Sequence, residues 1–208
     1  MKTFLILLTY LSCEIISIAQ TSDVYMRRGA AKANSDDFMG AISEYSKAIE
    51  LNPNEASPYF GRGGMKNSLK DYYGAISDYN IAIKIDPTFT GAYINRAESK
   101  SALGDYRGSI LDFNKAIELI PNTESIMPYF GMAYNGRGIA KTNLGDYKGA
   151  ISDFNNVIDD GPEWAWPYFC RGNAKFKLNN KKEACLDWSK AGELGYKEAY
   201  ETIRKFCN

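Results

Sequence analysis

Apolar positions recur along most of the chain at the spacing of an amphipathic helix. Ala75, Ile76, Tyr79, Ala82 and Ile83 show it in one segment, and equivalent segments occur before and after. Turn signals made of glycine, aspartate or proline separate these segments. The pattern therefore predicts an all-helical chain in which short turns join consecutive helices.

A second, longer period repeats this whole pattern. Five arginines lie at intervals of 34, 34, 41 and 34 residues, and the same intervals separate five tyrosines, five lysines and five aromatic residues. The arginines are Arg28, Arg62, Arg96, Arg137 and Arg171. Several series in parallel at one period indicate a repeat protein, in which each unit buries its apolar face against its neighbours.

Each unit is predicted to contain two helices. The first begins near a proline in three units, at Pro58, Pro128 and Pro167. It ends at Leu-Gly-Asp-Tyr in the third and fourth units, where glycine can adopt a left-handed conformation. The second helix should end at the residue before a proline, as at Asn52-Pro53 and Asp86-Pro87, since proline disfavours helical geometry in that residue.

The pattern Tyr-x-x-Arg-Gly-x-x-Lys, Leu-Gly-Asp-Tyr, Gly-Ala-Ile-x-Asp-Tyr/Phe-Asn-x-Ala-Ile and Pro resembles the tetratricopeptide repeat. The resemblance implies an all-α, right-handed α-solenoid of five helical hairpins plus a C-terminal capping helix at 196–207. The expected units are 22–55, 56–89, 90–123 with a seven-residue insertion at about 124–130, 131–164 and 165–198. The chain departs from the usual family pattern at three repeat positions. Tyr replaces Trp at the fourth, Arg replaces Leu at the seventh, and Lys replaces Tyr at the eleventh.

The first 19 residues have the order of a secretory signal peptide. Met1-Lys2 precedes an apolar run, and Ser17-Ile18-Ala19 provides the small residues of a cleavage site. A cleaved signal places the mature chain in the periplasm or outside the cell. The alternatives are an uncleaved anchor or a lipid anchor at Cys13.

The chain contains no histidine, and its 25 basic residues equal its 25 acidic ones. The lack of histidine rules out Ser-His-Asp and Cys-His catalytic pairs and imidazole metal ligands. Balanced charge argues against nucleic acid as a partner. No phosphate-binding glycine loop or metal-ligand spacing is present. We therefore expect a non-catalytic protein without a cofactor; a carboxylate-based enzyme is a less favoured alternative.

In each unit the first helix carries the repeated arginine and lysine, and the second helix carries an acidic residue at a constant spacing from them. These acids are Glu44, Asp78, Asp112, Asp153 and Asp187. A buried charge needs a partner, so we interpret the series as a ladder of partly buried ion pairs and not as a basic ligand site.

The resemblance also implies a concave groove lined by the first helices, which would bind a protein or peptide. The groove positions are Met26, Arg27, Phe60, Asn67, Ile94, Asn95, Glu98, Asn135, Ile139, Asn143, Trp166, Phe169 and Asn173. Some family members clamp a terminal carboxylate with Lys and Asn at the fifth and ninth positions, but the fifth positions here are Met26, Phe60, Ile94, Asn135 and Phe169, so that clamp is not expected. Gly61, Gly64 and Gly136 would let a backbone approach closely. The alternative for Phe60 and Phe169 is packing between units, and the alternative for the whole protein is self-association.

The insertion adds a second candidate surface. Tyr129, Phe130 and Met132 would be exposed if the insertion lengthened the first helix of its unit. The alternative is a loop that folds back and fills space.

Three cysteines follow the expected signal: Cys170, Cys185 and Cys207. An oxidising compartment allows one disulfide. We favour Cys185–Cys207, which would fix the capping helix, and Cys170–Cys185 is the alternative. The C-terminal segment resembles that of secreted repeat proteins from Bacteroidetes.

Overall fold

The computed structural model describes residues 22–120 and 129–207. Within them every regular element is a helix, as predicted. The first helices of the hairpins are residues 22–33, α3 (Ala56–Ser68), α5 (Thr90–Ala102), α7 (Tyr129–Asn143) and α9 (Ala165–Lys177). The second helices are α2 (Phe38–Leu51), α4 (Tyr72–Ile85), α6 (Tyr106–Leu119), α8 (Tyr147–Asp160) and α10 (Lys181–Glu193). The chain ends with α11 (Glu198–Phe206).

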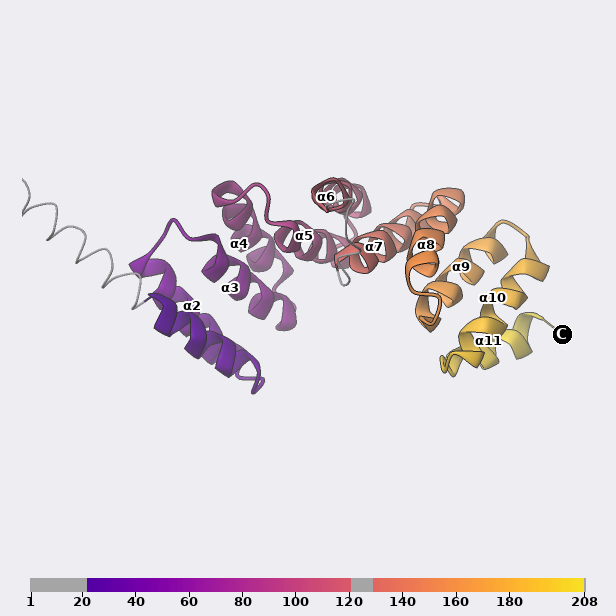
Figure 1. Ribbon diagram of the computed structural model, residues 1–208, viewed down its shortest axis with the longest axis horizontal. Coiled ribbons are helices and arrows are strands. Elements are labelled where there is room, and N and C mark those ends of the chain that lie inside the picture. The colour runs from indigo at the N-terminus through magenta and orange to yellow at the C-terminus, as the bar shows by residue number, and fades with distance from the viewer. Residues whose placement is uncertain (1–21, 121–128, 208) are drawn as a thin grey trace, which may run out of the picture. The chain divides into compact units, whose positions relative to one another are not determined.

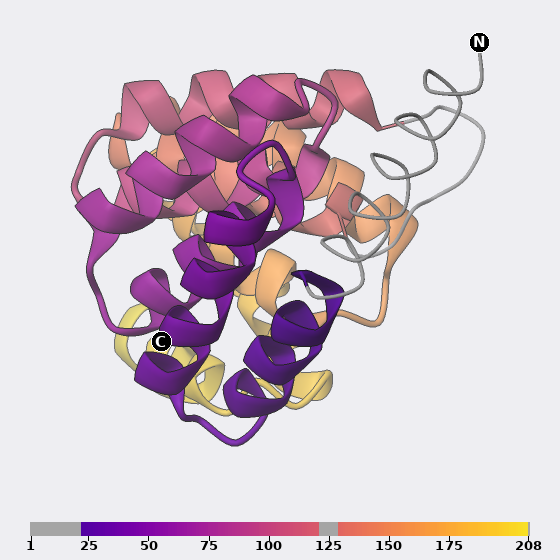
Figure 2. The same cartoon turned by 90° about the vertical axis from the view of Figure 1, so that its left-hand side faces the viewer.

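The chain divides into two compact units between Ser99 and Lys100, within α5. In the N-terminal unit the helix of residues 22–33 lies beside α2, and α3 pairs with α4 (Figures 1 and 2). In the C-terminal unit α7 pairs with α8, α9 with α10, and α11 packs on α10 (Figure 1). Each unit is thus a stack of helical hairpins joined by short turns.

Helix boundaries follow the signals predicted from the sequence. The residue before a proline caps the end of α2 and of α4, at Asn52 and Asp86. The turn within a hairpin requires a left-handed residue, with φ of 81° at Gly104 and 82° at Gly145. At the equivalent place in the second hairpin Lys70 adopts φ of 63°.

Aspartates start four of the second helices. Asp37, Asp71, Asp105 and Asp146 each accept a hydrogen bond from the backbone N–H of the glycine three residues later, at 2.9–3.0 Å. A Cβ on any of these glycines would lie within 2.2 Å of the aspartate carboxylate. These glycines therefore serve helix capping, as expected for repeat positions.

The aromatic residue of each second helix is the core of its hairpin. Tyr79, Phe113, Phe154 and Trp188 are at most 1% exposed. Their rings need a neighbouring residue without a side chain. A Cβ on Gly63, for example, would lie 2.7 Å from the Tyr79 ring.

The same packing corrects one expectation about glycine. Gly61 and Gly136 do not leave room for a ligand backbone, because the rings of Tyr45 and Phe113 already fill that space. A Cβ would lie 2.8 Å from the Tyr45 ring at Gly61 and 2.3 Å from the Phe113 ring at Gly136. Gly64 has open space beside it.

The predicted pairing of arginine and lysine with an acidic residue is confirmed in the second, fourth and fifth repeats. Arg171 holds both oxygens of Asp187 at 2.7 and 2.9 Å, and Lys175 adds a contact of 2.8 Å. Asp187 is only 5% exposed, so its charge is compensated in a nearly dry site. Arg62 with Asp78 and Arg137 with Asp153 repeat this bidentate geometry.

The ladder arginines also join successive hairpins. Arg62, Arg96, Arg137 and Arg171 each donate from Nη1 to a serine or asparagine of the preceding second helix: Ser46, Asn80, Asn114 and Asn155, at 2.7–3.1 Å. Each guanidinium also lies over the ring of the tyrosine three residues earlier, 5.0–5.7 Å from its centroid. The repeated Tyr-x-x-Arg therefore fixes the register between hairpins.

In the first hairpin, lysines compensate the charge of the buried acidic residue. Lys32 and Lys47 lie 3.6 and 3.2 Å from Glu44. Burial raises the pKa of the Glu44 carboxyl, but the hydrogen bonds and charges of Lys47 and Lys32 outweigh burial, so the net pKa is lowered.

Candidate binding groove between α7 and α9

Two cavities in the C-terminal unit share Trp166 as a common wall. The larger has a volume of about 340 Å³ and is lined by Gly131, Met132, Asn135, Val157, Trp164, Ala165, Trp166 and Pro167. The smaller has a volume of about 180 Å³ and is lined by Ile139, Thr142, Asn143, Phe154, Trp166, Cys170 and Asn173. We call this pair of cavities the α7–α9 groove.

Trp166 is held in place and still presents surface to solvent. Its side chain is 43% exposed. The Tyr196 ring packs edge-on against it at 5.3 Å, and Phe169 lies 4.7 Å from the same Tyr196 ring. Tyr196 comes from the connection between α10 and α11, so the C-terminal cap supports the groove. An exposed tryptophan fixed between two cavities has the properties of a binding anchor.

Asn135 lines the larger cavity at a repeat position where the second repeat has a phenylalanine. Asn135 and Phe60 occupy equivalent repeat positions, 75 residues apart, and Trp164 is likewise equivalent to Phe89. In the N-terminal unit Phe60 packs on Phe89 with ring centroids 4.7 Å apart and fills the space. The shorter Asn135 leaves that space empty beside Trp164.

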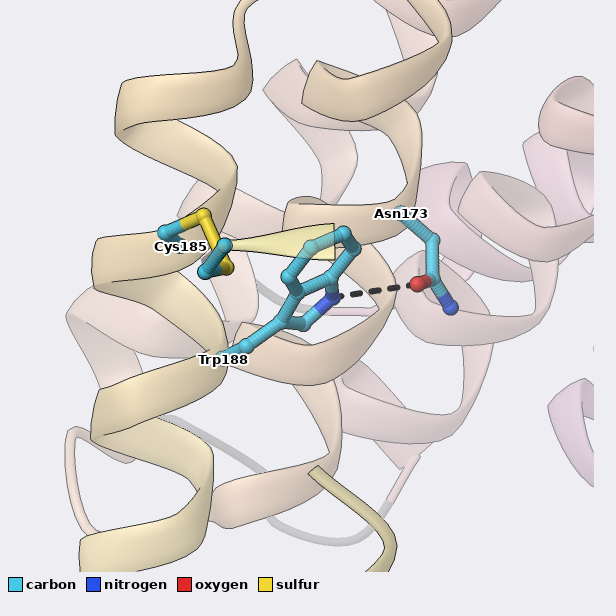
Figure 3. The surroundings of a disulfide bond; sticks show 4 residues. Asn173, Cys185 and Trp188 are labelled. Carbon is cyan, nitrogen blue, oxygen red and sulfur yellow. Dashed lines mark hydrogen bonds between the residues drawn. A yellow bond between two sulfur atoms is a disulfide. The ribbon is translucent and has the colours of Figure 1, made fainter. Parts of the chain in front are cut away.

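The asparagines of the groove have different hydrogen-bonding states. Asn143 donates from Nδ2 to the Ile139 carbonyl at 2.9 Å. Asn173 accepts at Oδ1 from the indole N–H of Trp188 at 3.0 Å (Figure 3). Asn135 Oδ1 is buried without a hydrogen-bond partner. Asn143 and Asn173 thus differ in the amide group that is already engaged, Nδ2 in Asn143 and Oδ1 in Asn173.

None of the described residues that line the two cavities carries a charge. The polar side-chain groups of the lining are the amides of three asparagines, the hydroxyl of Thr142, the thiol of Cys170 and the indole N–H groups of Trp164 and Trp166. A ligand of this groove would therefore contact apolar surface and neutral hydrogen-bonding groups.

Five of the six groove positions expected in the C-terminal unit line these cavities: Asn135, Ile139, Asn143, Trp166 and Asn173. Phe169 differs, because it packs against Tyr196. Met132, which was expected in the exposed patch near the insertion, lines the larger cavity and is 38% exposed. Of the other patch residues, Tyr129 is 37% exposed and Phe130 packs on Tyr134 at 4.5 Å.

Sequence reasoning missed several lining residues, among them Trp164, Thr142 and Cys170. Cys170 lies in α9, and the sequence indicates for it only a possible disulfide. Trp164 caps the N-terminus of α9 and was assigned to no helix face. The sequence signal that could have identified Trp164 as a lining residue is its equivalence to Phe89 in the repeat.

The positions expected in the N-terminal unit do not line these cavities. Ile94 is completely buried and Phe60 packs between Tyr79 and Phe89, so both serve the core of their unit. Asn67 Oδ1 accepts from Ser99 at 3.1 Å. The remaining expected positions, Met26, Arg27, Asn95 and Glu98, range from partly buried to exposed. Glu98 is exposed by area, yet desolvation by neighbouring atoms raises the pKa of its carboxyl.

A disulfide joins Cys185 of α10 to Cys207 after α11, with 5.9 Å between the Cα atoms (Figure 3). Cys170 is a free, buried thiol, so the structure contains the first of the two pairings considered from the sequence. Phe206 packs on Phe176 at 4.8 Å, which places the cap over the last hairpin.

Burial raises the pKa of the Cys170 thiol to about 12. We expect iodoacetamide to leave Cys170 unmodified at pH 8 in the folded protein and to modify it in 6 M guanidinium, because thiolates react and thiols do not. Raising the pH from 9 toward 12 should also favour unfolding, since the unfolded thiol ionises first. Intact-protein mass spectrometry measures the modification. Rapid labelling at pH 8 without unfolding would show that Cys170 is accessible and ionised.

No helix within residues 22–120 and 129–207 is long and apolar enough to cross a membrane. The same residues contain no group of three side chains able to hold a metal ion. The predicted signal peptide, Cys13 and the insertion up to residue 128 lie outside the described residues.

Residues 90–123 match the family model of the tetratricopeptide repeat. The crystal structure of MamA protein is similar, with 25% identity, a TM-score of 0.74, and coverage of 88% of this chain and 96% of that one. YrrB, described as a tetratricopeptide protein with an unusual peptide-binding site, has 19% identity and a TM-score of 0.71 over 86% of this chain and 90% of its own.

The structure of pilF from Pseudomonas aeruginosa is also similar, with 13% identity and a TM-score of 0.74 over 86% of this chain and 78% of its own. No curated protein sequence matches the chain significantly. The matched repeat and the all-α hairpin architecture together support a tetratricopeptide repeat protein.

Proposed function

We propose that this chain is a non-catalytic scaffold whose α7–α9 groove binds a peptide segment of a partner protein. The exposed Trp166 between two uncharged cavities carries the proposal. A volume of about 340 Å³ is within the range of about 300–1,000 Å³ that is usual for ligand pockets. The similarity to YrrB, which has a peptide-binding site, supports the same class of ligand.

We also propose that the protein acts in the cell envelope or outside the cell, as five repeat units within residues 22–198. The signal-like residues 1–19 support this location, and so does the Cys185–Cys207 disulfide, because disulfides persist in oxidising compartments. A lipid anchor at Cys13 is the alternative mode of attachment. The C-terminal likeness to secreted repeat proteins of Bacteroidetes points to the same location.

The packing of α11 favours a partner-binding role over self-association by exchange of the cap. The apolar residues of α11 contact its own chain, since Phe206 packs on Phe176 and on Trp188. The disulfide fixes α11 to α10. A cap in this position is not available to the groove of a second copy.

Replacement of Trp166 by alanine tests the proposed function. Peptides are first selected from a displayed library of random dodecapeptides on the purified chain, then synthesised and titrated by calorimetry. We expect Trp166→Ala to weaken binding at least 30-fold, which corresponds to the 2 kcal/mol or more typical of an interface hot spot.

The matched control is Leu111→Ala, which truncates an exposed side chain (69%) on α6 outside the groove and should leave the affinity unchanged. Both variants should unfold near the wild-type midpoint. If the library yields no peptide, or if Trp166→Ala binds like wild type, the α7–α9 groove is not the binding site.

A further inference from the structure

We propose that the smaller cavity holds one peptide group of the partner's main chain between Asn143 and Asn173, within an internal, uncharged segment. This inference rests on the proposed function and specifies the ligand of the same groove. It assigns opposite roles to the two asparagines, as acceptor and as donor.

The roles follow from the hydrogen bonds that each amide already makes. Asn173 Oδ1 already accepts from the Trp188 indole N–H, and no described hydrogen bond engages its Nδ2 donor (Figure 3). Asn143 already donates one Nδ2 hydrogen to the Ile139 carbonyl, and no described hydrogen bond engages its Oδ1 acceptor. Both side chains line one cavity, Asn143 from the end of α7 and Asn173 from α9. One donor and one acceptor across a cavity match the C=O and N–H of a peptide backbone.

The apolar lining selects the side chains next to that peptide group. The smaller cavity has about 180 Å³ between Ile139, Phe154 and Trp166, somewhat more than the engineered cavity of about 150 Å³ that accepts benzene. The larger cavity, which Trp166 also lines, accepts a bulkier group. We therefore assign an apolar side chain of the partner to each cavity.

The lack of charge selects an internal segment over a chain end. A terminal carboxylate or amine buried here would lack a counter-ion, because no charged residue is among those that line the cavities. Acidic and basic side chains are disfavoured for the same reason. Binding should consequently change little between 50 and 500 mM salt, since no ion pair is formed.

Two matched substitutions test the assignment with the peptide selected on the wild-type chain. Asn143→Asp keeps the acceptor but loses the Nδ2 donor to the Ile139 carbonyl, whereas Asn173→Asp keeps the contact with Trp188 and removes the donor to the ligand. Both add one negative charge to the same cavity, and the lost Ile139 contact in Asn143→Asp works against the difference that we expect. We expect the affinity to fall at least 10-fold for Asn173→Asp relative to Asn143→Asp, because a buried carbonyl of the ligand loses its partner.

Methylation of single backbone nitrogens in the selected peptide provides a test on the wild-type protein. One N-methyl position should weaken binding at least 10-fold, because it removes the N–H that Asn143 accepts. Equal loss in the two aspartate variants, or a scan without a sensitive position, would overturn the assignment while leaving the Trp166→Ala result intact. Selection of peptides that depend on a charged residue or a free terminus would also overturn it. Failure of the proposed function gives a different result, because Trp166→Ala would then leave the peptide affinity unchanged.

Discussion

Replacing Arg171 with alanine should lower the free energy of unfolding by about 3 kcal/mol, or the midpoint by about 10 °C. The substitution removes two hydrogen bonds to Asp187, one to Asn155 and the cation–π contact with Tyr168. The loss is large because the Asp187 carboxylate stays buried. The expected loss of stability is near the lower end of the range for a broken buried ion pair, because Lys175 still pairs with Asp187 at 2.8 Å.

Thermal unfolding followed by circular dichroism measures this effect, with Arg107→Ala as the control. Arg107 is an exposed arginine of α6, and its removal should change the midpoint by no more than about 1–2 °C. Peptide affinity of Arg171→Ala, measured below its midpoint, should equal that of wild type. Wild-type stability combined with weaker peptide binding would show that the arginines serve the ligand and not the fold.

Removing the disulfide with Cys185→Ser and Cys207→Ser should cost about 3 kcal/mol of stability. The bond closes a loop with a sequence separation of 22 residues, for which loop entropy predicts a loss of that size. The free cap would also lose its contact between Phe206 and Phe176. Tyr196 would become less restrained against Trp166, so peptide affinity should fall as well.

Thermal unfolding of the double variant, and of the wild-type chain in a dithiol reductant, should show the same decrease. Cys170→Ala is the control, because it leaves the disulfide intact and removes one buried sulfur. An unchanged midpoint in the double variant would show that packing alone fixes the cap.

The parts of the fold that are local in sequence could be predicted. Helix ends follow from residues such as Asn52-Pro53 and Gly104, whose backbone preferences act within a few residues. The pairing of Arg171 with Asp187 followed from its repetition, because a charge that recurs on the inner face of every unit requires a recurring partner.

The parts that depend on which residues meet between hairpins could not be predicted. Phe60 and Asn135 hold the same repeat position, yet one fills the space beside Phe89 and the other opens a cavity beside Trp164. Tyr196 lies outside the first helices and was assigned to no groove, although it supports Trp166. Such contacts depend on side-chain volume, which the repeat pattern does not encode.

Asn135→Phe tests directly whether the larger cavity is a binding site. Phenylalanine should fill the cavity against Trp164 as Phe60 fills the equivalent space against Phe89, so the stability should be equal to that of wild type or higher. Calorimetric titration with the selected peptide should then show at least a 30-fold loss of affinity. Wild-type affinity in a stably folded Asn135→Phe variant would show that the larger cavity is not part of the binding site.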